Sequence, residues 1–420
     1  MSDAEHPSAQ PLPPAYGGRG KRRGRAPRSH TVGKVVLASV VTLAMLTGLS
    51  VAFFYRHLNG NLNVEDLSGQ LYDRPDKAKV EGPKEPLNIL VMGSDTREGE
   101  GNAIDGEHAG PGLSDTTILV HLSADRKTAY GVSIPRDTLV DRPDCKSKDG
   151  DTIPGASTVM WNVAFALGGP ACTMQQLEQL TGVRLDNYVV VDFSGFRDMV
   201  DAVDGVEVCI PEDIDDSAHG ITLDAGTREL KGTDALKYVR VRHIGDGSDI
   251  GRIARQQAFI AAMANKVISG GTLARVDRLV RFLNAATKSL TTDLKNIREI
   301  AQVGLQFKNI GLKKIQFITA PWRYSPSQPG RVELLPEAEQ LWEKIRTDAP
   351  LGKLRQGAIN AGEVPGASPS PSPSASGSED ASQGSSSPSG AASPSPTTSP
   401  GEQAQQEAEQ QAREQAGLCT

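Results

Sequence analysis

The hydrophobic pattern begins with one long apolar run near the N-terminus. Residues 35–55, VVLASVVTLAMLTGLSVAFFY, carry no charge, and a helix needs roughly 20 apolar residues to cross a bilayer. A cleaved secretory signal is the alternative interpretation, because Ser50 and Ala52 are placed like a small-residue cleavage site. The apolar run continues through residues 53–55, which favours a transmembrane helix that anchors the protein.

Strand-like and helix-like patterns alternate over residues 87–350. Runs rich in β-branched and aliphatic residues predict strands, and apolar positions on one helical face predict helices. The predicted strands are 87–92, 116–122, 128–134, 187–193, 206–210, 236–242 and 313–322. The predicted helices are 173–182, 194–205 with Ser194 as N-cap, 252–268, 274–290, 294–307 and 336–347. The alternation predicts an α/β domain with a mixed central β-sheet flanked by helices.

Polar segments surround this domain. Residues 1–34 hold seven Lys or Arg and two Asp or Glu, and positive flanks of a membrane helix stay in the cytoplasm. We therefore expect a disordered cytoplasmic head and a single-pass protein of the cell membrane whose main body is extracytoplasmic. Residues 56–86, which are polar with several prolines, predict a stalk. Residues 351–420 are Pro/Ser/Gly-rich and then Gln/Glu-rich, which predicts a disordered C-terminal tail.

Composition narrows the choice of partners and compartment. The formal net charge of −6 gives no sign of a nucleic-acid binder. Four cysteines fit an oxidising exterior. Cys145 and Cys172 flank a loop and the start of a predicted helix and are a plausible disulfide, whereas Cys209 reads equally well as a buried free thiol. The sequence has no CxxC pair or His/Cys spacing that indicates zinc.

Charged residues gather where the first three predicted strands end or begin. Asp95 and Arg97 follow the first strand, at the carboxyl end where open α/β sheets bind ligands. Asp115 opens the second strand, and the short connection after it predicts a hairpin that returns Arg136 to the same edge. Two carboxylates beside arginines are a usual arrangement for Mg²⁺ and a phosphate. The alternative is that both aspartates are turn and cap residues.

A second cationic cluster lies in YVRVRHIGDGSDIGRIARQQ, residues 238–257. A strand here would place Arg240 and Arg242 on one face, and Asp249 would cap a helix whose first turns hold Arg252 and Arg255. Positive charge near a helix N-terminus opposes the macrodipole, and a bound anion reverses that penalty. The cluster therefore predicts a multiply charged anion such as a pyrophosphate; a solvated, salt-bridged surface is the alternative.

These motifs together resemble the LytR-CpsA-Psr family, in its actinobacterial form. The resemblance covers roughly residues 87–270 and rests on NILVMGSDTR, LSDTTILV, SIPRD, VDAVDGVEV, LDAGTRELKGTDALKYVRVRH and DIGRIARQQ, which occur in matching order. It implies that residues 87–350 are a catalytic domain with the family fold. The implied activity is an extracytoplasmic, Mg²⁺-dependent phosphotransfer, with Mn²⁺ as an alternative ion. A glycopolymer would pass from a polyprenyl-pyrophosphate lipid carrier to peptidoglycan.

The resemblance also implies roles for individual residues. Metal ligands would be Asp95 and Asp115. The pyrophosphate would be bound by Arg97, Arg136, Arg240, Arg242, Arg252, Arg255 and Gln256. The catalytic group would comprise Asp95, Asp115, Arg136, Arg240 and Arg252. Asn162 matches a family asparagine, although Trp161 replaces the lysine that usually precedes it.

Three further points stay open at the level of sequence. A lipid channel would be lined by Phe193, Phe196, Met199, Phe259, Ile260 and Met263, although an ordinary core explains each of them equally. The acceptor's proton would pass to Asp95, Asp137 or Asp249. The alternatives to a transferase are a non-catalytic polyprenyl-phosphate-binding regulatory protein and a polyprenyl pyrophosphatase; a pure binder needs arginines but no metal-binding carboxylates.

Overall fold

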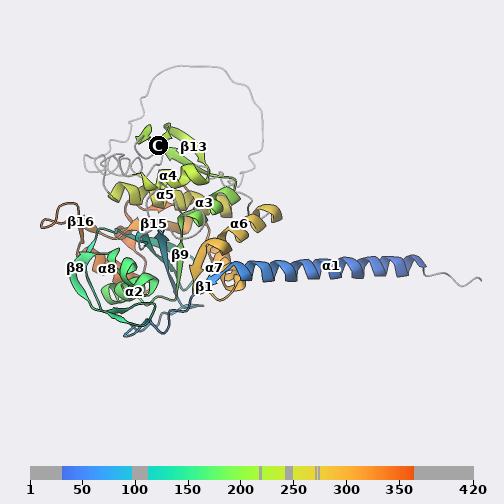
Figure 1. Cartoon of the computed structure of the whole chain (residues 1–420), viewed down its shortest axis with the longest axis horizontal. Helices are drawn as coiled ribbons and strands as arrows, with labels where there is room; N and C mark the ends of the chain where they lie inside the picture. The colour runs from blue at the N-terminus through green and yellow to red at the C-terminus, as the bar shows by residue number, and fades with distance from the viewer. Residues whose placement is uncertain are drawn as a thin grey trace, which may run out of the picture. The chain divides into compact units, whose positions relative to one another are not determined.

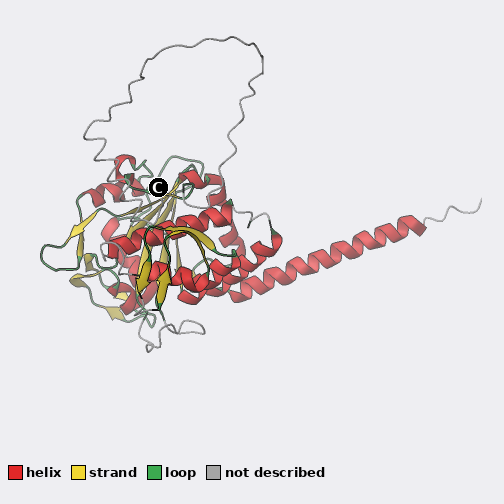
Figure 2. Ribbon diagram, turned by 90° about the horizontal axis from the view of Figure 1, so that it is seen from above, coloured by secondary structure: helices red, strands yellow, loops and turns green. Residues whose placement is uncertain are grey.

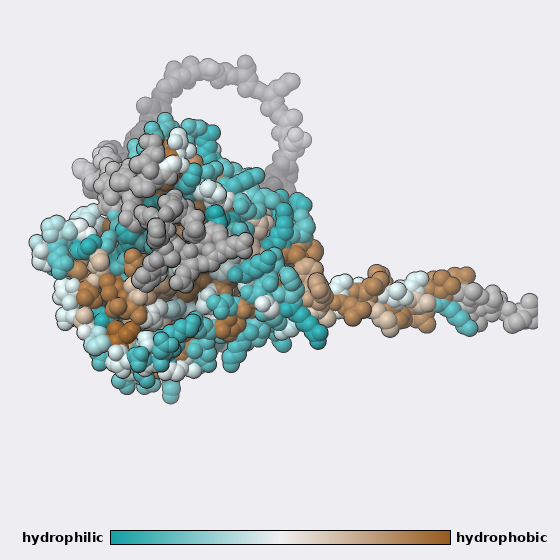
Figure 3. Space-filling view, viewed as in Figure 1, coloured by the Kyte–Doolittle hydropathy of each residue, from teal (hydrophilic) through white to brown (hydrophobic). Residues whose placement is uncertain are grey.

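The structure is a computed structural model that describes residues 31–96, 112–216, 220–241, 249–269, 272 and 275–363. The chain forms two compact units, Met1–Phe54 and Tyr55–Thr420. Helix α1, Thr31–Asn61, begins in the first unit and is long and apolar enough to cross a membrane. Its apolar side chains are exposed from Val32 to Tyr55 (Figure 3), whereas Leu58 near its end is buried. This helix fits a single-pass membrane anchor.

A mixed eight-stranded sheet forms the centre of the second unit. Its strand order is β1-β14-β9-β2-β3-β4-β15-β18. The strands span Asn63–Val64 (β1), Leu290–Thr292 (β14), Asn187–Val191 (β9), Leu87–Ser94 (β2), Ser114–Leu122 (β3), Ala129–Ile134 (β4), Ile315–Thr319 (β15) and Ile359–Asn360 (β18). The β2–β3 and β3–β4 pairs are antiparallel, whereas β2–β9 and β4–β15 are parallel. One edge of the sheet therefore collects the ends of β9, β2, β4 and β15 and the start of β3.

Helices cover both faces of this sheet (Figures 1 and 2). They are α2 (Val163–Thr181), α3 (Phe193–Ala202), α4 (Gly232–Arg240), α5 (Asp249–Ile268), α6 (Val276–Ser289), α7 (Ile297–Ile310) and α8 (Glu337–Arg346). Helices α3, α4 and α5 share one hydrophobic core, which includes Val200, Tyr238 and Phe259. Helices α2 and α8 share the core on the other face, around Leu177 and Trp342. The predicted α/β fold with a mixed central sheet is confirmed.

Small two-stranded sheets extend from this framework. Their pairs are β5–β8, β6–β7, β10–β13, β11–β12 and β16–β17. Their strands are Leu139–Arg142 (β5), Cys145–Lys146 (β6), Thr152–Ile153 (β7), Ala156–Met160 (β8), Val206–Ile210 (β10), Ile214–Asp216 (β11), Ile221–Leu223 (β12), Gly226–Leu230 (β13), Trp322–Tyr324 (β16) and Val332–Leu334 (β17). One of these pairs, β11–β12, lines the cavity described below, and β16 follows β15 along the chain.

One predicted strand is wrong. Residues 236–242 were expected to be extended, but residues up to Arg240 belong to helix α4. The buried positions Ala235, Leu236, Tyr238 and Val239 follow helical spacing. Tyr238 and Arg240 alternate with Val239 and Val241, which is a pattern typical of a strand. The helical pattern is evident only when the preceding Ala235 and Leu236 are included. Tyr238 is fully buried, so it cannot stand beside the arginines on an exposed strand face.

The predicted stalk and one boundary also need correction. Within residues 56–86, β1 pairs with β14 and Leu67 is buried in a core cluster. Arg74 binds the buried Glu178 at 2.6 Å. These residues therefore pack on the domain, because β pairing and burial outweigh the polar composition of the segment. At the other end, β18 joins the central sheet, so the folded region continues past residue 350.

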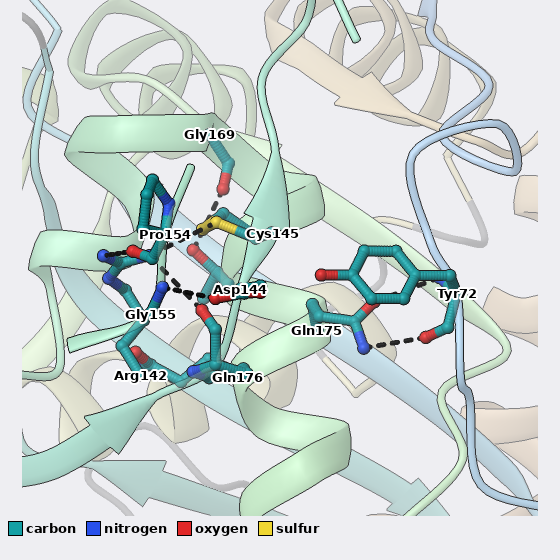
Figure 4. Close-up of a disulfide and its surroundings, with 12 residues drawn as sticks. Tyr72, Arg142, Asp144, Cys145, Pro154, Gly155, Gly169, Gln175 and Gln176 are labelled. Atoms are coloured by element: carbon teal, nitrogen blue, oxygen red, sulfur yellow. Dashed lines mark hydrogen bonds between the residues drawn. A yellow bond between two sulfur atoms is a disulfide. The ribbon is translucent and has the colours of Figure 1, made fainter. Parts of the chain in front are cut away.

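A buried disulfide joins β6 to α2 (Figure 4). It links Cys145 and Cys172, the pair suggested by the sequence, and both residues are buried. Around it, Arg142 Nη2 donates to Pro154 O at 2.5 Å, and Asp144 Oδ1 accepts the Gly155 N–H at 2.6 Å. Cys209 is disulfide-bonded as well, which corrects its interpretation as a free thiol.

Candidate active site

A cavity of about 700 Å³ opens beside the sheet edge defined above. Its floor comes from β2, β3 and β9, and its walls come from α3, α4 and α5. The apolar lining includes all the residues proposed for a lipid channel, namely Phe193, Phe196, Met199, Phe259, Ile260 and Met263. Phe196 and Phe259 are adjacent, with ring centroids 5.3 Å apart. Some of these residues are also core residues, so the wall of the cavity is part of the hydrophobic core.

Two carboxylates stand on the polar side of this cavity. Asp95 follows the last residue of β2, and Asp115 is the second residue of β3; both line the cavity. The Asp95 N–H donates to Leu113 O at 3.0 Å, and Asp95 Oδ1 accepts the Leu113 N–H. These two hydrogen bonds connect the end of β2 to the residue before β3. Asp95 therefore has the structural role of a turn residue, as the alternative interpretation proposed, in addition to facing the cavity. The antiparallel register brings both carboxylates to one edge.

Arg136 lies behind Asp115. Its Nη1 donates to Asp115 Oδ1 at 2.6 Å, and its Nε is 3.1 Å from Asp249 Oδ1. Burial disfavours the charged guanidinium, but the carboxylates of Asp115, Asp249 and Asp137 outweigh burial and raise the pKa of Arg136. The three predicted residues Asp95, Asp115 and Arg136 therefore converge. Arg136 itself is not among the residues that line the cavity.

Arg252 lines the cavity from the first turn of α5. Its side chain is almost completely buried and forms an ion pair with Asp249. Burial raises the pKa of Asp249, and the charges of Arg252 and Arg136 only partly oppose this rise. A carboxylate in the first helical turn also offsets the unfavourable position of Arg252 near the helix N-terminus.

Arg240 and Gln256 complete the polar side of the cavity. Arg240 ends α4, and its guanidinium carbon lies 4.8 Å from the centre of the Phe193 ring. Gln256 Oε1 accepts the Thr116 hydroxyl at 2.9 Å, and its Nε2 donates to Val239 O at 3.2 Å. Gln256 therefore ties α5 to β3 and α4 while facing the cavity.

The remaining arginines that were predicted to bind pyrophosphate are not among the described residues that line the cavity. Arg255 is buried and donates to Val241 O, and it is not among the cavity-lining residues. Adjacent residues of a helix point in different directions, so Gln256 faces the cavity while Arg255 faces the backbone that follows α4. Arg97 and Arg242 lie outside the described residues.

Comparison with known protein families identifies the family of this chain. Residues 56–345 match the sequence profile of the LytR_cpsA_psr family. The chain belongs to this family. That match begins within the segment expected to be a stalk, in agreement with its packing on the domain.

Two relatives bear names that place them in cell-wall assembly. The chain is 31% identical to the cell wall biosynthesis protein LcpA of Corynebacterium glutamicum, over 70% of this chain and 60% of LcpA. It is 29% identical to the polyisoprenyl-teichoic acid–peptidoglycan teichoic acid transferase TagV of Bacillus subtilis, over 62% of this chain and 64% of TagV. The alignments thus cover less than two thirds of the length of either relative.

The chain is also similar to a relative named as a regulatory protein and to a solved structure with a similar fold. The chain is 28% identical to the regulatory protein MsrR of Staphylococcus aureus, over 57% of this chain and 65% of MsrR. A crystal structure of a Streptococcus agalactiae protein matches with a TM-score of 0.51 and 22% identity, over 64% of this chain and 90% of that chain. This last match supports the family fold.

Trp161 explains a departure from the family pattern. The lysine position before Asn162 is taken by a fully buried tryptophan whose Nε1–H donates to Thr117 Oγ1 at 3.1 Å. Asn162 is also buried, and its backbone N–H donates to Arg136 O at 3.3 Å. In this chain Asn162 therefore supports the backbone of Arg136 through a hydrogen bond, and the Trp161 backbone N–H donates to the nearby Thr138 O at 2.8 Å.

Sequence reasoning missed six polar residues of the cavity. They are Thr116, Asp192, Arg197, Asp216, Thr233 and Lys237. Lys237 precedes Arg240 by three residues, so recognising α4 as a helix would have placed the two on one face. The predicted N-cap Ser194 is also wrong: Asp192 caps α3 by accepting the Gly195 N–H at 2.7 Å.

Asp95 and Asp115 fit a divalent-metal site in which substrate phosphate and water supply the other ligands. Within the described ranges, no group of three or more His, Cys, Asp or Glu side chains is arranged to hold a metal. Mg²⁺, however, is commonly bound by one or two carboxylates, with water and substrate phosphate as the other ligands. Two cavity-lining carboxylates satisfy this requirement when a phosphate ligand is present.

Proposed function

We propose that this protein is an extracytoplasmic transferase that moves a glycopolymer from a polyprenyl-pyrophosphate lipid carrier to peptidoglycan. The single observation that carries the proposal is the composition of one cavity. Aromatic and aliphatic side chains line its interior, while Asp95, Asp115, Arg240 and Arg252 stand together on its polar side. A ligand that fits both parts has an apolar chain joined to a multiply charged anion. The family relationship and the transferase activity for which TagV is named support this substrate class.

The arginines would bind and polarise the pyrophosphate. Arg240 and Arg252 line the cavity, and the burial of Arg252 strengthens its attraction to phosphate oxygens. Arg136 would act through Asp115 as a positioning residue. Fixed positive charges stabilise negative charge that builds on the leaving group.

Asp95 and Asp115 would hold Mg²⁺, or Mn²⁺ in its place. The ion, when bound, supplies Lewis-acid stabilisation of the phosphate charge. The remaining chemistry is a displacement: an acceptor hydroxyl forms a bond to the phosphorus that carries the sugar, and the bond from that phosphorus to the lipid phosphate oxygen breaks. The products are a glycan phosphodiester and a polyprenyl phosphate.

The acceptor hydroxyl must also lose a proton. Among the three candidates, Asp95 lines the cavity, whereas Asp137 and Asp249 do not. Asp249 is held between Arg136 and Arg252, and Asp137 is 2.9 Å from Arg331. Asp95 is therefore the proposed acceptor of this proton.

The proposed location follows from the anchor and the disulfide. The basic residues before α1 favour a cytoplasmic N-terminus, and a buried structural disulfide is typical of an oxidising compartment. A reporter enzyme fused after residue 363 tests this orientation. It should be active only outside the cell, and cytoplasmic activity would contradict the proposed orientation.

An assay with three readouts separates the proposed transferase from its alternatives. The full chain in detergent is incubated with lipid-linked oligosaccharide and soluble peptidoglycan fragments, with Mg²⁺ or with EDTA. A transferase gives an oligosaccharide–peptidoglycan conjugate only with Mg²⁺. Release of polyprenyl phosphate with no conjugate would indicate a pyrophosphatase. Lipid binding with no release would indicate a regulatory binder, the class suggested by the name of MsrR.

A further inference from the structure

The β16–β17 hairpin carries an aromatic pair that the cavity does not use. Trp322 and Tyr324 lie on one face of β16, because side chains alternate along a strand. Their ring centroids are 5.1 Å apart in an edge-to-face arrangement. Tyr324 is 54% exposed and Trp322 is half-buried. Exposed aromatic pairs cost solvation free energy and commonly mark binding surfaces.

The hairpin is fixed to the segment that carries Arg136. The Val332 N–H donates to Asp137 O at 3.2 Å, and Arg331 Nη1 is 2.9 Å from Asp137 Oδ1. A β-bridge joins Val332 to Thr138. Strand β17 is therefore bonded to the residues that directly follow Arg136, and β16 is held there by its pairing with β17. Movement of this hairpin relative to the site would break these contacts.

Strand order places the hairpin and the cavity on opposite sides of Arg136. The cavity floor lies over β9, β2 and β3, and Arg136 follows β4. The hairpin follows β15, which is the next strand beyond β4. Figure 1 shows the same succession, with β16, β15 and β9 in order across the view. Gln257 of α5 bonds both Ser133 and Thr319, which holds β4 and β15 in place at this edge.

We propose that Trp322 and Tyr324 form a binding platform for the acceptor glycan strand. This inference rests on the proposed function, because it assigns a place to the second substrate. In phosphoryl transfer the attacking and leaving oxygens lie roughly in line across the phosphorus. The lipid leaves toward the cavity, so the acceptor hydroxyl must approach from the opposite side, which is the side of β15 and the hairpin.

The chemistry of the hairpin suits a sugar chain. The C–H bonds on one face of a pyranose ring carry partial positive charge and pack on the negative face of an aromatic ring. Arg323 and Glu333, which pair at 3.0 Å on the same hairpin, and the exposed Ser327 supply polar groups at the margin, while the buried Ser325 hydroxyl holds Glu333 in place. A platform of this kind binds a neutral glycan backbone and leaves the charge of the donor to the arginines.

The fluorescence of Trp322 offers a direct test. The chain has three tryptophans, and the other two, Trp161 and Trp342, are buried. Titration of the full chain in detergent with a soluble peptidoglycan tetrasaccharide should therefore quench or shift tryptophan emission. The signal should disappear in Trp322→Phe, and the affinity should fall about tenfold in Tyr324→Ala, which corresponds to about 1.4 kcal/mol. Tyr324→Phe, which keeps the ring, should retain most of the affinity, and maltohexaose should give no saturable change.

Kinetics distinguish failure of this inference from failure of the proposed function. In the transfer assay, Tyr324→Ala should raise KM for the glycan about tenfold while the affinity for the lipid donor and the melting temperature stay unchanged. Transfer with unchanged KM, together with no emission change in wild type, would overturn the platform and leave the transferase intact. Saturable glycan binding at Trp322 without any transfer would support the platform and overturn the proposed activity.

Discussion

Arg136 and Asp115 form a close ion pair, with Nη1 and Oδ1 2.6 Å apart, that joins the end of β4 to the start of β3. Both side chains are mostly buried, and Asp115 faces the cavity while Arg136 stands behind it. The orientation of a cavity carboxylate therefore depends on a residue outside the cavity. The register of the β3–β4 hairpin thus places Arg136 where it orients the Asp115 carboxylate toward the cavity.

Removal of the positive partner should cost both stability and metal affinity. Arg136→Ala leaves Asp115, Asp249 and Asp137 without their shared cation, and breaking a buried pair costs about 3 kcal/mol. The Mg²⁺ concentration needed for half-maximal activity should rise, because Asp115 loses its orienting contact. Arg136→Lys should restore part of both, since a lysine provides charge without the fork geometry. Denaturant unfolding and Mg²⁺ titration of activity measure the two effects; an unchanged Mg²⁺ requirement in Arg136→Ala would assign the pair a purely structural role.

Neutral substitutions at the two cavity carboxylates should remove turnover and spare the fold. Asp95→Asn keeps a side-chain oxygen for the Leu113 N–H, so its melting temperature should change by only a few degrees. Metal-dependent transfer should fall by at least about a hundredfold, the loss typical of removing an electrostatic catalytic group. Asp115→Asn should act similarly on turnover and be less stable, because it weakens the ion pair with Arg136. Full activity of both variants would reduce the aspartates to turn residues.

Arg240 and Arg255 should respond oppositely to alanine substitution. Arg240 faces the cavity, so Arg240→Ala should weaken donor binding by about ten- to a hundredfold, equivalent to roughly 1.5–3 kcal/mol. Arg255 holds the carbonyl of Val241 inside the protein, so Arg255→Ala should mainly lower the melting temperature. Isothermal titration with the lipid and thermal unfolding of both variants check the contrast, and equal loss of affinity at unchanged stability would refute it.

Asp249 should make stability depend on pH. Burial raises the pKa of its folded-state carboxyl above the ordinary 3.8, so the folded protein holds this proton more tightly than the unfolded chain. Its contribution to the free energy of unfolding therefore decreases as pH rises from 3.8 through the raised pKa. Asp249→Asn does not titrate, so its melting temperature relative to wild type should increase between about pH 4 and about pH 7. A relative melting temperature that stays constant or falls over this range would contradict the assignment.

The sequence was sufficient for the parts of the molecule that depend on local pattern. Alternating strands, the antiparallel β3–β4 hairpin and the convergence of Asp95 with Asp115 followed from element order and short connections. The end of α4 did not, because Val239 and Val241 suit a strand and only the burial of Ala235 and Leu236 selects the helix. The direction of Arg255 depended on the rotation of α5, which tertiary contacts such as those of Gln256 and Gln257 determine. Packing of residues 56–86 was equally inaccessible, since β1 pairs with β14 and Arg74 pairs with Glu178, both more than a hundred residues away.

The location of the transferred phosphorus tests the central claim most directly. A lipid-linked oligosaccharide labelled with ³²P only in the sugar-bearing phosphate is incubated with the full chain, Mg²⁺ and peptidoglycan fragments. The proposed displacement predicts that the label appears in the glycan phosphodiester, in equal amount to the transferred oligosaccharide, and that the released polyprenyl phosphate is unlabelled. Label recovered on the released lipid or as a free sugar phosphate, with none in the glycan, would contradict the account.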